Sequence, residues 1–162
     1  MTIYDKVKAR YDYLINHTVY GLEAVLTPDP FDFSTRALYR FDFVLAIRAH
    51  YALVNHLGVC DDYTSAFVLM TRRIGLESYF VSGKIEGDGH AWALIKMNGQ
   101  YYLFDPQVED NIAKGGPIKY WLFFKSEHPD GFNYEYRNRD ADISSFRGFE
   151  TAPYEDSFFG KR

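Results

Sequence analysis

Apolar residues recur at helical spacing in three parts of this chain. The first stripe lies in residues 3–17 and consists of Ile3, Val7, Tyr11 and Leu14. Thr2 and Asp5 precede and enter this stripe with the three-residue separation of a capping box. The pattern therefore predicts an amphipathic helix over residues 3–17.

Two further helices are predicted on either side of a glycine. After the loop-like segment "TPDPFDFS", residues 35–55 form the second predicted helix, for which Ser34 can serve as the N-cap. Gly58 interrupts the pattern, and a new stripe then runs through "CDDYTSAFVLMTRRIG" and ends at Gly75. Cys60 is therefore expected to open a largely buried helix.

Strand patterns follow the third helix. Residues 76–85 are rich in β-forming residues, and residues 90–105 form two such arms around Asn98-Gly99, a strong hairpin signal. Residues 106–117 are predicted to be a loop, and "IKYWLFFKS" from Ile118 a buried strand. The hairpin predicts that this part of the sheet is antiparallel.

The domain organisation expected from this pattern is simple. Residues 1–135 are expected to form one domain, because a chain of 162 residues is long enough for a single core. Residues 136–162 are polar and turn-rich without a sustained period, and we expect an extension that wraps the surface or frays.

Composition narrows the classes of partner. The net charge is −4 and the basic residues are scattered, which argues against nucleic acid as a partner. No apolar run approaches the roughly 20 residues of a spanning helix, and "MTIYDKVKAR" has no apolar signal core. We therefore expect no membrane insertion, in a protein that acts where it is made or in a domain cut from an exported chain.

Cysteine and histidine usage also limits the chemistry. Cys60 is the only cysteine, so it can form no internal disulfide and no multi-thiolate metal site. The five histidines include no pair at the helical spacing of zinc enzymes. We expect neither a metal nor another cofactor. Taken alone, a single cysteine is more often an inert core residue than a nucleophile.

The hairpin register supplies Cys60 with a candidate base. A helix N-terminus favours a thiolate, but Asp61 and Asp62 in the same turn repel it, so activation requires a nearby base. If Asn98-Gly99 forms the turn, Asp105 lies opposite Trp92, and His90 is its diagonal neighbour about 7–8 Å away. Their side chains can then form a hydrogen bond.

Three motifs contain the candidate residues, namely "GVC" at residues 58–60, "HAW" at residues 90–92 and Asp105-Pro106. They resemble motifs of the transglutaminase-like cysteine enzymes, especially the small bacterial members. The resemblance implies a papain-like α+β fold in which the Cys60 helix packs against an antiparallel sheet. It also implies Cys60 as nucleophile, His90 as general base and then acid, and Asp105 as the residue that orients His90. Gln107 and Val108 differ from the Thr-Trp pair usual after this motif.

Four further residues are candidates for the surroundings of the thiol. Where the small bacterial members often have a tyrosine ten residues before the cysteine, this chain has His50 followed by Tyr51, and either is a candidate second oxyanion donor beside the Cys60 amide. Trp92 is expected to pack or to shape a substrate cleft. Asp62 is expected either to lie at a solvated helix start or to select an amine group.

The first hypothesis for function is a thiol enzyme that hydrolyses amides in a protein or peptide, as a protease or deamidase. An alternative with the same triad is a protein-glutamine transamidase, in which an amine replaces water. A second alternative, from another class, is a non-catalytic domain that binds peptide or glycan. The sequence leaves all three open.

Overall fold

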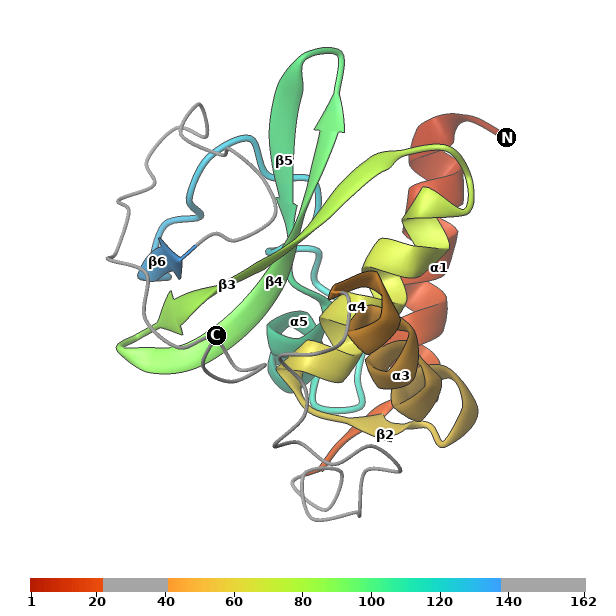
Figure 1. The fold of residues 1–162 in the computed structure, drawn as a ribbon. Helices are drawn as coiled ribbons and strands as arrows, with labels where there is room; N and C mark the ends of the chain where they lie inside the picture. The colour runs from red at the N-terminus through yellow and green to blue at the C-terminus, as the bar shows by residue number, and fades with distance from the viewer. Residues whose placement is uncertain (22–40, 138–162) are drawn as a thin grey trace.

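The computed structural model describes residues 1–21 and 41–137, and the predicted cap at Ser34 lies outside them. Helices α1 (Ile3–His17), α3 (Phe41–Val54) and α4 (Cys60–Arg72) lie on one side of an antiparallel sheet (Figure 1). The sheet contains β3 (Glu77–Ile85), β4 (Asp88–Met97), β5 (Gln100–Phe104) and β6 (Tyr134–Arg137), in the order β5-β4-β3-β6. This arrangement confirms the predicted α+β class.

Helix α1 has the bounds and the cap that the sequence predicted. The Thr2 hydroxyl accepts a hydrogen bond from the Asp5 backbone amide at 3.1 Å, and Asp5 accepts one from the Thr2 amide at 2.9 Å. The stripe of Val7, Tyr11 and Leu14 is fully buried. The capping box therefore fixes the start of a helix whose apolar face enters the core.

Helix α4 begins at Cys60, as predicted, and the chain enters it through a tight approach. The Asp62 carboxylate accepts a hydrogen bond from the Val59 amide at 2.8 Å. A Cβ atom on Gly58 would lie 2.6 Å from the Asp62 Cβ, a distance that side chains do not tolerate. Gly58 is therefore required by the close approach of the backbone to the first turn of α4.

A short parallel ladder holds the segment before Cys60 in place. Strand β1 (Val19–Tyr20) pairs with β2 (Leu57–Gly58), so that Tyr20 lies opposite Gly58. The Gly21 amide also donates to the Gly58 carbonyl at 3.1 Å. This ladder brings the end of α1 next to the start of α4.

The hairpin register is as predicted. Met97 pairs with Gln100, and Ala93 pairs with Phe104 at the last ladder position of β4 and β5. Asn98 and Gly99 both have positive φ, 53° and 77°, as a type I′ turn requires. Side chains alternate between the two faces of the sheet along β4. Ala91 and Ala93 therefore belong to the apolar cluster on one face, and Trp92 and Leu94 belong to the cluster on the other.

Helix α5 (Pro106–Ala113) occupies the segment for which a loop was predicted. That prediction was wrong because Asp105 is an N-cap, whose carboxylate accepts from the Val108 amide at 3.2 Å, and Pro106 stands at the first helical position. Both are helix-start signals. The consequence is that Asp105 ends β5 and begins α5, which fixes its side chain from two directions.

The strand predicted from Ile118 is also wrong. Residues 118–126 consist of irregular segments, a turn and bends, and among the described residues one bridge, between Leu103 and Lys125, joins this segment to the sheet. Tyr120 and Phe124 both have φ of 58°, which no extended strand accommodates. The apolar run is therefore explained by turns that bury Leu122 and Phe123.

The sheet also contains a strand that the sequence pattern did not reveal. Strand β6 pairs antiparallel with β3, and Ser82 lies opposite Arg137. The predicted domain boundary at residue 135 falls within β6, and the rest of the predicted extension lies outside the described residues. Segment 134–137 is thus part of the same sheet as the hairpin.

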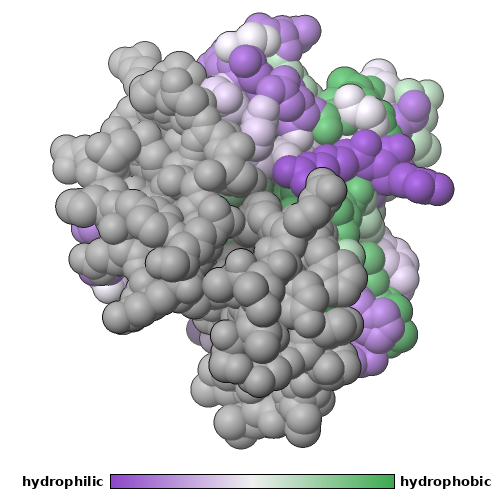
Figure 2. Space-filling model, in the orientation of Figure 1, coloured by the Kyte–Doolittle hydropathy of each residue, from purple (hydrophilic) through white to green (hydrophobic). Residues whose placement is uncertain are grey.

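The described surface in this orientation mixes hydrophilic and hydrophobic residues (Figure 2). Several large apolar side chains on α1 and β1 are exposed, namely Ile3, Tyr4, Tyr13, Val19 and Tyr20. Among the described residues, no helix combines the length and the apolar character that crossing a bilayer requires.

Candidate active site

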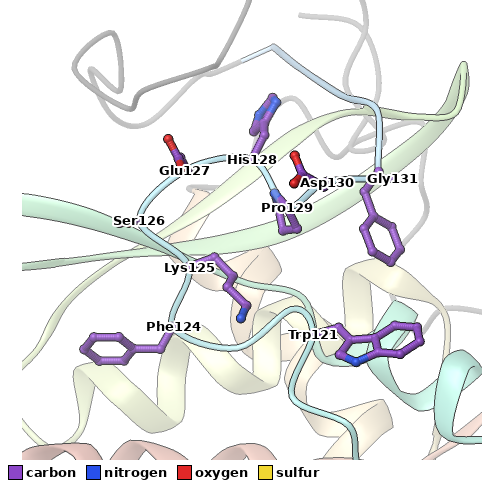
Figure 3. Close-up of a pocket in the computed structure, with 10 residues that line it drawn as sticks. Trp121, Phe124, Lys125, Ser126, Glu127, His128, Pro129, Asp130 and Gly131 are labelled. Atoms are coloured by element: carbon purple, nitrogen blue, oxygen red, sulfur yellow. The ribbon is translucent and has the colours of Figure 1, made fainter.

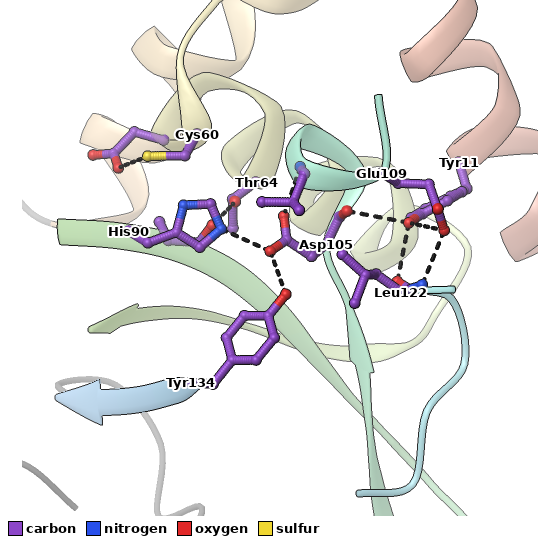
Figure 4. Close-up of polar contacts among 11 residues, drawn as sticks. Tyr11, Cys60, Thr64, His90, Asp105, Glu109, Leu122 and Tyr134 are labelled. Atoms are coloured by element: carbon purple, nitrogen blue, oxygen red, sulfur yellow. Dashed lines mark hydrogen bonds and ion pairs between the residues drawn. The ribbon is translucent and has the colours of Figure 1, made fainter. Parts of the chain in front are cut away.

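The thiol of Cys60 lies at the N-terminus of α4, where the helix contacts β4. Cys60 is 8% exposed, and its sulfur lies 3.6 Å from Oδ1 of Asp61. One turn further along α4, the Thr64 hydroxyl donates to the Ala91 carbonyl at 3.1 Å. Because Ala91 follows His90, this hydrogen bond fixes the thiol-bearing helix against the strand that carries the histidine (Figure 4).

The predicted contact between His90 and Asp105 is present. Nε2 of His90 lies 2.7 Å from Oδ2 of Asp105, and both side chains are buried. A carboxylate only accepts hydrogen bonds, so Nε2 carries the ring proton and Nδ1 is left to accept one. In Figure 4 the imidazole of His90 lies between the sulfur of Cys60 and the carboxylate of Asp105.

The Asp105 carboxylate has partners on both oxygens. Oδ1 accepts the Val108 amide, and Oδ2 also accepts the hydroxyl of Tyr134 at 2.7 Å. The Tyr11 hydroxyl also contacts this region, 3.2 Å from the Asp105 carbonyl oxygen and 3.3 Å from Oε1 of Glu109. Tyr134 was missed by sequence reasoning, because only the fold brings β6 to this position.

Electrostatics at the thiol favour its neutral form. Burial raises the pKa of Cys60 well above its usual value, and the charge of Asp61 raises it further, while the Ala91 amide lowers it. The raised pKa agrees with the expectation that the helix start alone does not activate Cys60. In the resting protein Cys60 is a thiol that needs a base.

The two aspartates after Cys60 are fully buried, so the prediction of a solvated helix start is wrong. Asp62 forms an ion pair with Arg48 at 3.2 Å, and Arg48 is itself 2% exposed. Burial raises the pKa of Asp61 to about 7, and Arg48 is the largest opposing influence. A buried cation on α3 thus balances two carboxylates beside the thiol.

The chain can be compared with known proteins once this geometry is established. A family model of the transglutaminase-like superfamily matches residues 1–106. This chain belongs to the transglutaminase-like superfamily. Members of the superfamily are generally cysteine enzymes. The matched region includes Cys60, His90 and Asp105 but ends before most of α5 and all of β6.

Two solved structures resemble part of this transglutaminase-like chain. One, described as "a TGase", is 25% identical with a TM-score of 0.45, and the match covers 64% of this chain and 26% of that one. The other, described as a "Putative Cysteine Protease from Cytophaga hutchinsonii", is 18% identical with a TM-score of 0.45, and the match covers 64% of this chain and 31% of that one. The match thus spans less than a third of either structure. No curated protein matches this chain.

The four residues predicted to surround the thiol differ in burial and in partners in this superfamily member. Tyr51 and His50 lie near the end of α3, Tyr51 buried and His50 exposed, and their roles as oxyanion donors stay predictions. Trp92 is fully buried and stacks on His90 with ring centroids 5.9 Å apart, so it supports the imidazole from within the core. Both Asp62 oxygens have protein partners, and its selection of an amine also stays a prediction.

Tyr20 is a further residue near the thiol that sequence reasoning did not assign. The β1–β2 ladder places it opposite Gly58, two residues before Cys60, and 42% of its surface is exposed. Burial raises the pKa of Tyr20, and ionisation of Cys60 would raise it further. A partly exposed phenol therefore lies within electrostatic reach of Cys60.

A cavity of about 730 Å³ has a lining that does not include Cys60, His90 or Asp105 (Figure 3). It is lined by residues between Trp121 and Phe132, with aromatic rings and both signs of charge. One lining residue, His128, lies with its ring 5.7 Å from that of Tyr134. Among the described residues, no group of three acidic, histidine or cysteine side chains is arranged to hold a metal ion.

Replacing Asp61 with asparagine is expected to make the thiol more reactive. Asp61→Asn removes the negative charge 3.6 Å from the sulfur, so the pKa of Cys60 should fall. We expect alkylation by iodoacetamide at pH 8 to become about tenfold faster, because a larger fraction of the thiol is ionised. Mass spectrometry from pH 6 to pH 10 gives the rate.

The matched control is Asp110→Asn, which removes a half-buried carboxylate bonded to Tyr63 rather than to the thiol. Access of the reagent to Cys60 is common to all three proteins and does not affect their ratio. Equal alkylation rates for Asp61→Asn and the unmodified protein at every pH would show that Asp61 does not restrain the thiol.

Proposed function

We propose that this protein is a cysteine enzyme that hydrolyses amides in peptides or proteins through Cys60, His90 and Asp105. The observation that carries the proposal is the 2.7 Å hydrogen bond between His90 and Asp105. It leaves Nδ1 of His90 as the proton acceptor on the side of the ring that faces the Cys60 sulfur (Figure 4). Membership of a superfamily of cysteine enzymes supports the same conclusion.

The first half of the reaction forms a thioester. As the Cys60 sulfur attacks the carbonyl carbon, its proton moves to Nδ1 of His90, and the resulting imidazolium is stabilised by Asp105. The C–N bond then breaks, and His90 returns this proton to the leaving amine. Burial raises the pKa of the Cys60 thiol, so the thiol needs His90 as the acceptor of its proton.

The second half consumes the thioester. Water attacks the acyl carbon while Nδ1 of His90 accepts its proton, and the C–S bond breaks to release the carboxylic acid. The sulfur leaves as a thiolate and recovers the proton from His90. The Cys60 backbone amide, at the positive end of α4, is suited to bind the oxyanion in both halves.

Two other outcomes use the same residues differently. An amine in place of water at the thioester would make the protein a transamidase, so the triad alone does not decide between the two reactions. A peptide- or glycan-binding domain would instead use an aromatic surface such as the cavity between Trp121 and Phe132. That function has no need of the buried His90–Asp105 pair.

A peptide library tests the proposal directly. The protein is incubated with glutamine-containing peptides with and without a primary amine, and products are measured by mass spectrometry. Cleavage adds about 18 Da across the two fragments, deamidation adds about 1 Da, and amine incorporation with loss of ammonia subtracts about 17 Da from the sum of the reactants. Amine incorporation without hydrolysis would favour the transamidase, and no product would contradict an amide-directed enzyme.

A further inference from the structure

Tyr134 makes a contact that no part of the matched family region provides. Its hydroxyl donates to Oδ2 of Asp105 at 2.7 Å, the same oxygen that accepts from Nε2 of His90. Tyr134 lies in β6, beyond the family match over residues 1–106. The acceptor of the proposed triad is therefore shared between the catalytic histidine and a tyrosine from the last described strand.

The position of Tyr134 is fixed by its surroundings. Strand β6 pairs with β3, with Tyr134 opposite Ile85, and the side chain is 2% exposed. Its ring packs edge-to-face on Trp92 with centroids 4.9 Å apart, and Trp92 in turn stacks on His90. The phenol therefore reaches Asp105 from a rigid, buried support.

The chemistry of the phenol suits a permanent donor. Burial raises the pKa of Tyr134 well above its usual value, and the charge of Asp105 raises it further. The hydroxyl therefore keeps its proton at neutral pH and donates a hydrogen bond to the Asp105 carboxylate. A second donor on Oδ2 withdraws part of the negative charge that His90 would otherwise receive.

We propose that Tyr134 is a positioning residue that holds Asp105 toward His90 and limits how strongly the carboxylate attracts the imidazole proton. This inference rests on the proposed function, because it assigns a role within the same triad. The titratable groups around the His90–Asp105 pair come from every element packed against it, namely Tyr11, Cys60, Asp61, Glu109 and Tyr134.

The test replaces Tyr134 with phenylalanine, which removes the hydroxyl and keeps the ring that packs on Trp92. Without the phenol, Oδ2 accepts only from His90, so the shared hydrogen bond should strengthen. We expect the Nε2 proton of His90 to move downfield in the proton NMR spectrum. We also expect kcat/KM at neutral pH to fall about tenfold, with its acidic limb displaced to higher pH.

The control is Tyr63→Phe, which removes a different buried hydroxyl, one that reaches Thr18 and Asp110. It should reduce stability without moving the His90 proton or the acidic limb. The proposal would be overturned if Tyr134→Phe left both the chemical shift of the His90 Nε2 proton and the acidic limb of kcat/KM unchanged. A fall in activity alone would then indicate a merely structural role for Tyr134.

The spectroscopic readout separates this inference from the proposed function. If the His90 proton moves in Tyr134→Phe but the unmodified protein turns over no amide, the positioning role holds and amide hydrolysis fails. If turnover is present and the proton does not move, amide hydrolysis holds and the positioning role is wrong.

Discussion

Replacing Cys60 with alanine is expected to lower the turnover of any amide substrate by about 10⁴-fold or more, because no thioester can form without the sulfur. The remaining rate would come only from substrate binding and the oxyanion site. Folding should be almost unaffected, since the lost sulfur is small and its polar contact is with a carboxylate that repels the thiolate. Product formation by mass spectrometry and unfolding in urea measure the two effects.

The matched control for this variant is Ser65→Ala. Ser65 lies in the same helix and is also fully buried, and its hydroxyl has no hydrogen-bond partner among the described residues. Removing it changes a buried polar atom of α4 without touching the thiol, so activity should persist. Full activity in Cys60→Ala would exclude Cys60 as the nucleophile and leave the binding domain as the better hypothesis.

Local patterns were enough to place the parts of the candidate site that depend on short-range geometry. The turn at Asn98-Gly99 sets the register of β4 and β5, and this register brings His90 within reach of Asp105. Likewise, the break at Gly58 sets the start of α4 at Cys60. Both relations join residues that are close in sequence, and such relations can be predicted from turn residues and from the spacing of apolar residues.

The surroundings of these residues depend on contacts that local patterns do not contain. Tyr134 reaches Asp105 across 29 positions of the chain, and Arg48 reaches Asp62 across 14. A charged pair at a helix start is normally solvated, and only the packing of α3 on α4 shows that Asp61 and Asp62 are buried. Burial is also the largest cause of the raised pKa of Cys60, and the sequence pattern did not reveal how deeply this helix start is buried.

Replacing Arg48 with methionine is expected to destabilise the fold by about 3–5 kcal/mol, because it leaves the buried Asp62 carboxylate without its cation. Methionine retains much of the aliphatic volume, so the effect reports mainly the lost charge. Unfolding in urea, followed by circular dichroism, gives the free energy. The comparison is Lys8→Met, which removes a partly exposed pair with Asp12 and should cost about 1 kcal/mol or less.

The loss in free energy of unfolding caused by Arg48→Met should also depend on pH, because Asp61 titrates. In the unfolded chain Asp61 releases its proton near its usual pKa of 3.8, whereas burial raises the pKa in the folded protein to about 7. The folded state therefore loses stability as the pH rises between these values. Arg48 limits this loss by attracting the Asp61 charge, so its removal raises the folded pKa further and extends the loss to higher pH.

The destabilisation by Arg48→Met should therefore be larger at pH 8 than at pH 5. Adding Asp62→Asn should recover part of it, because the amide carries no charge and its oxygen can still accept from the Val59 amide. A deficit below about 1 kcal/mol at both pH values, or no recovery in the double variant, would show that the ion pair does not hold the start of α4. The charge balance around Cys60 would then have to come from elsewhere in the protein.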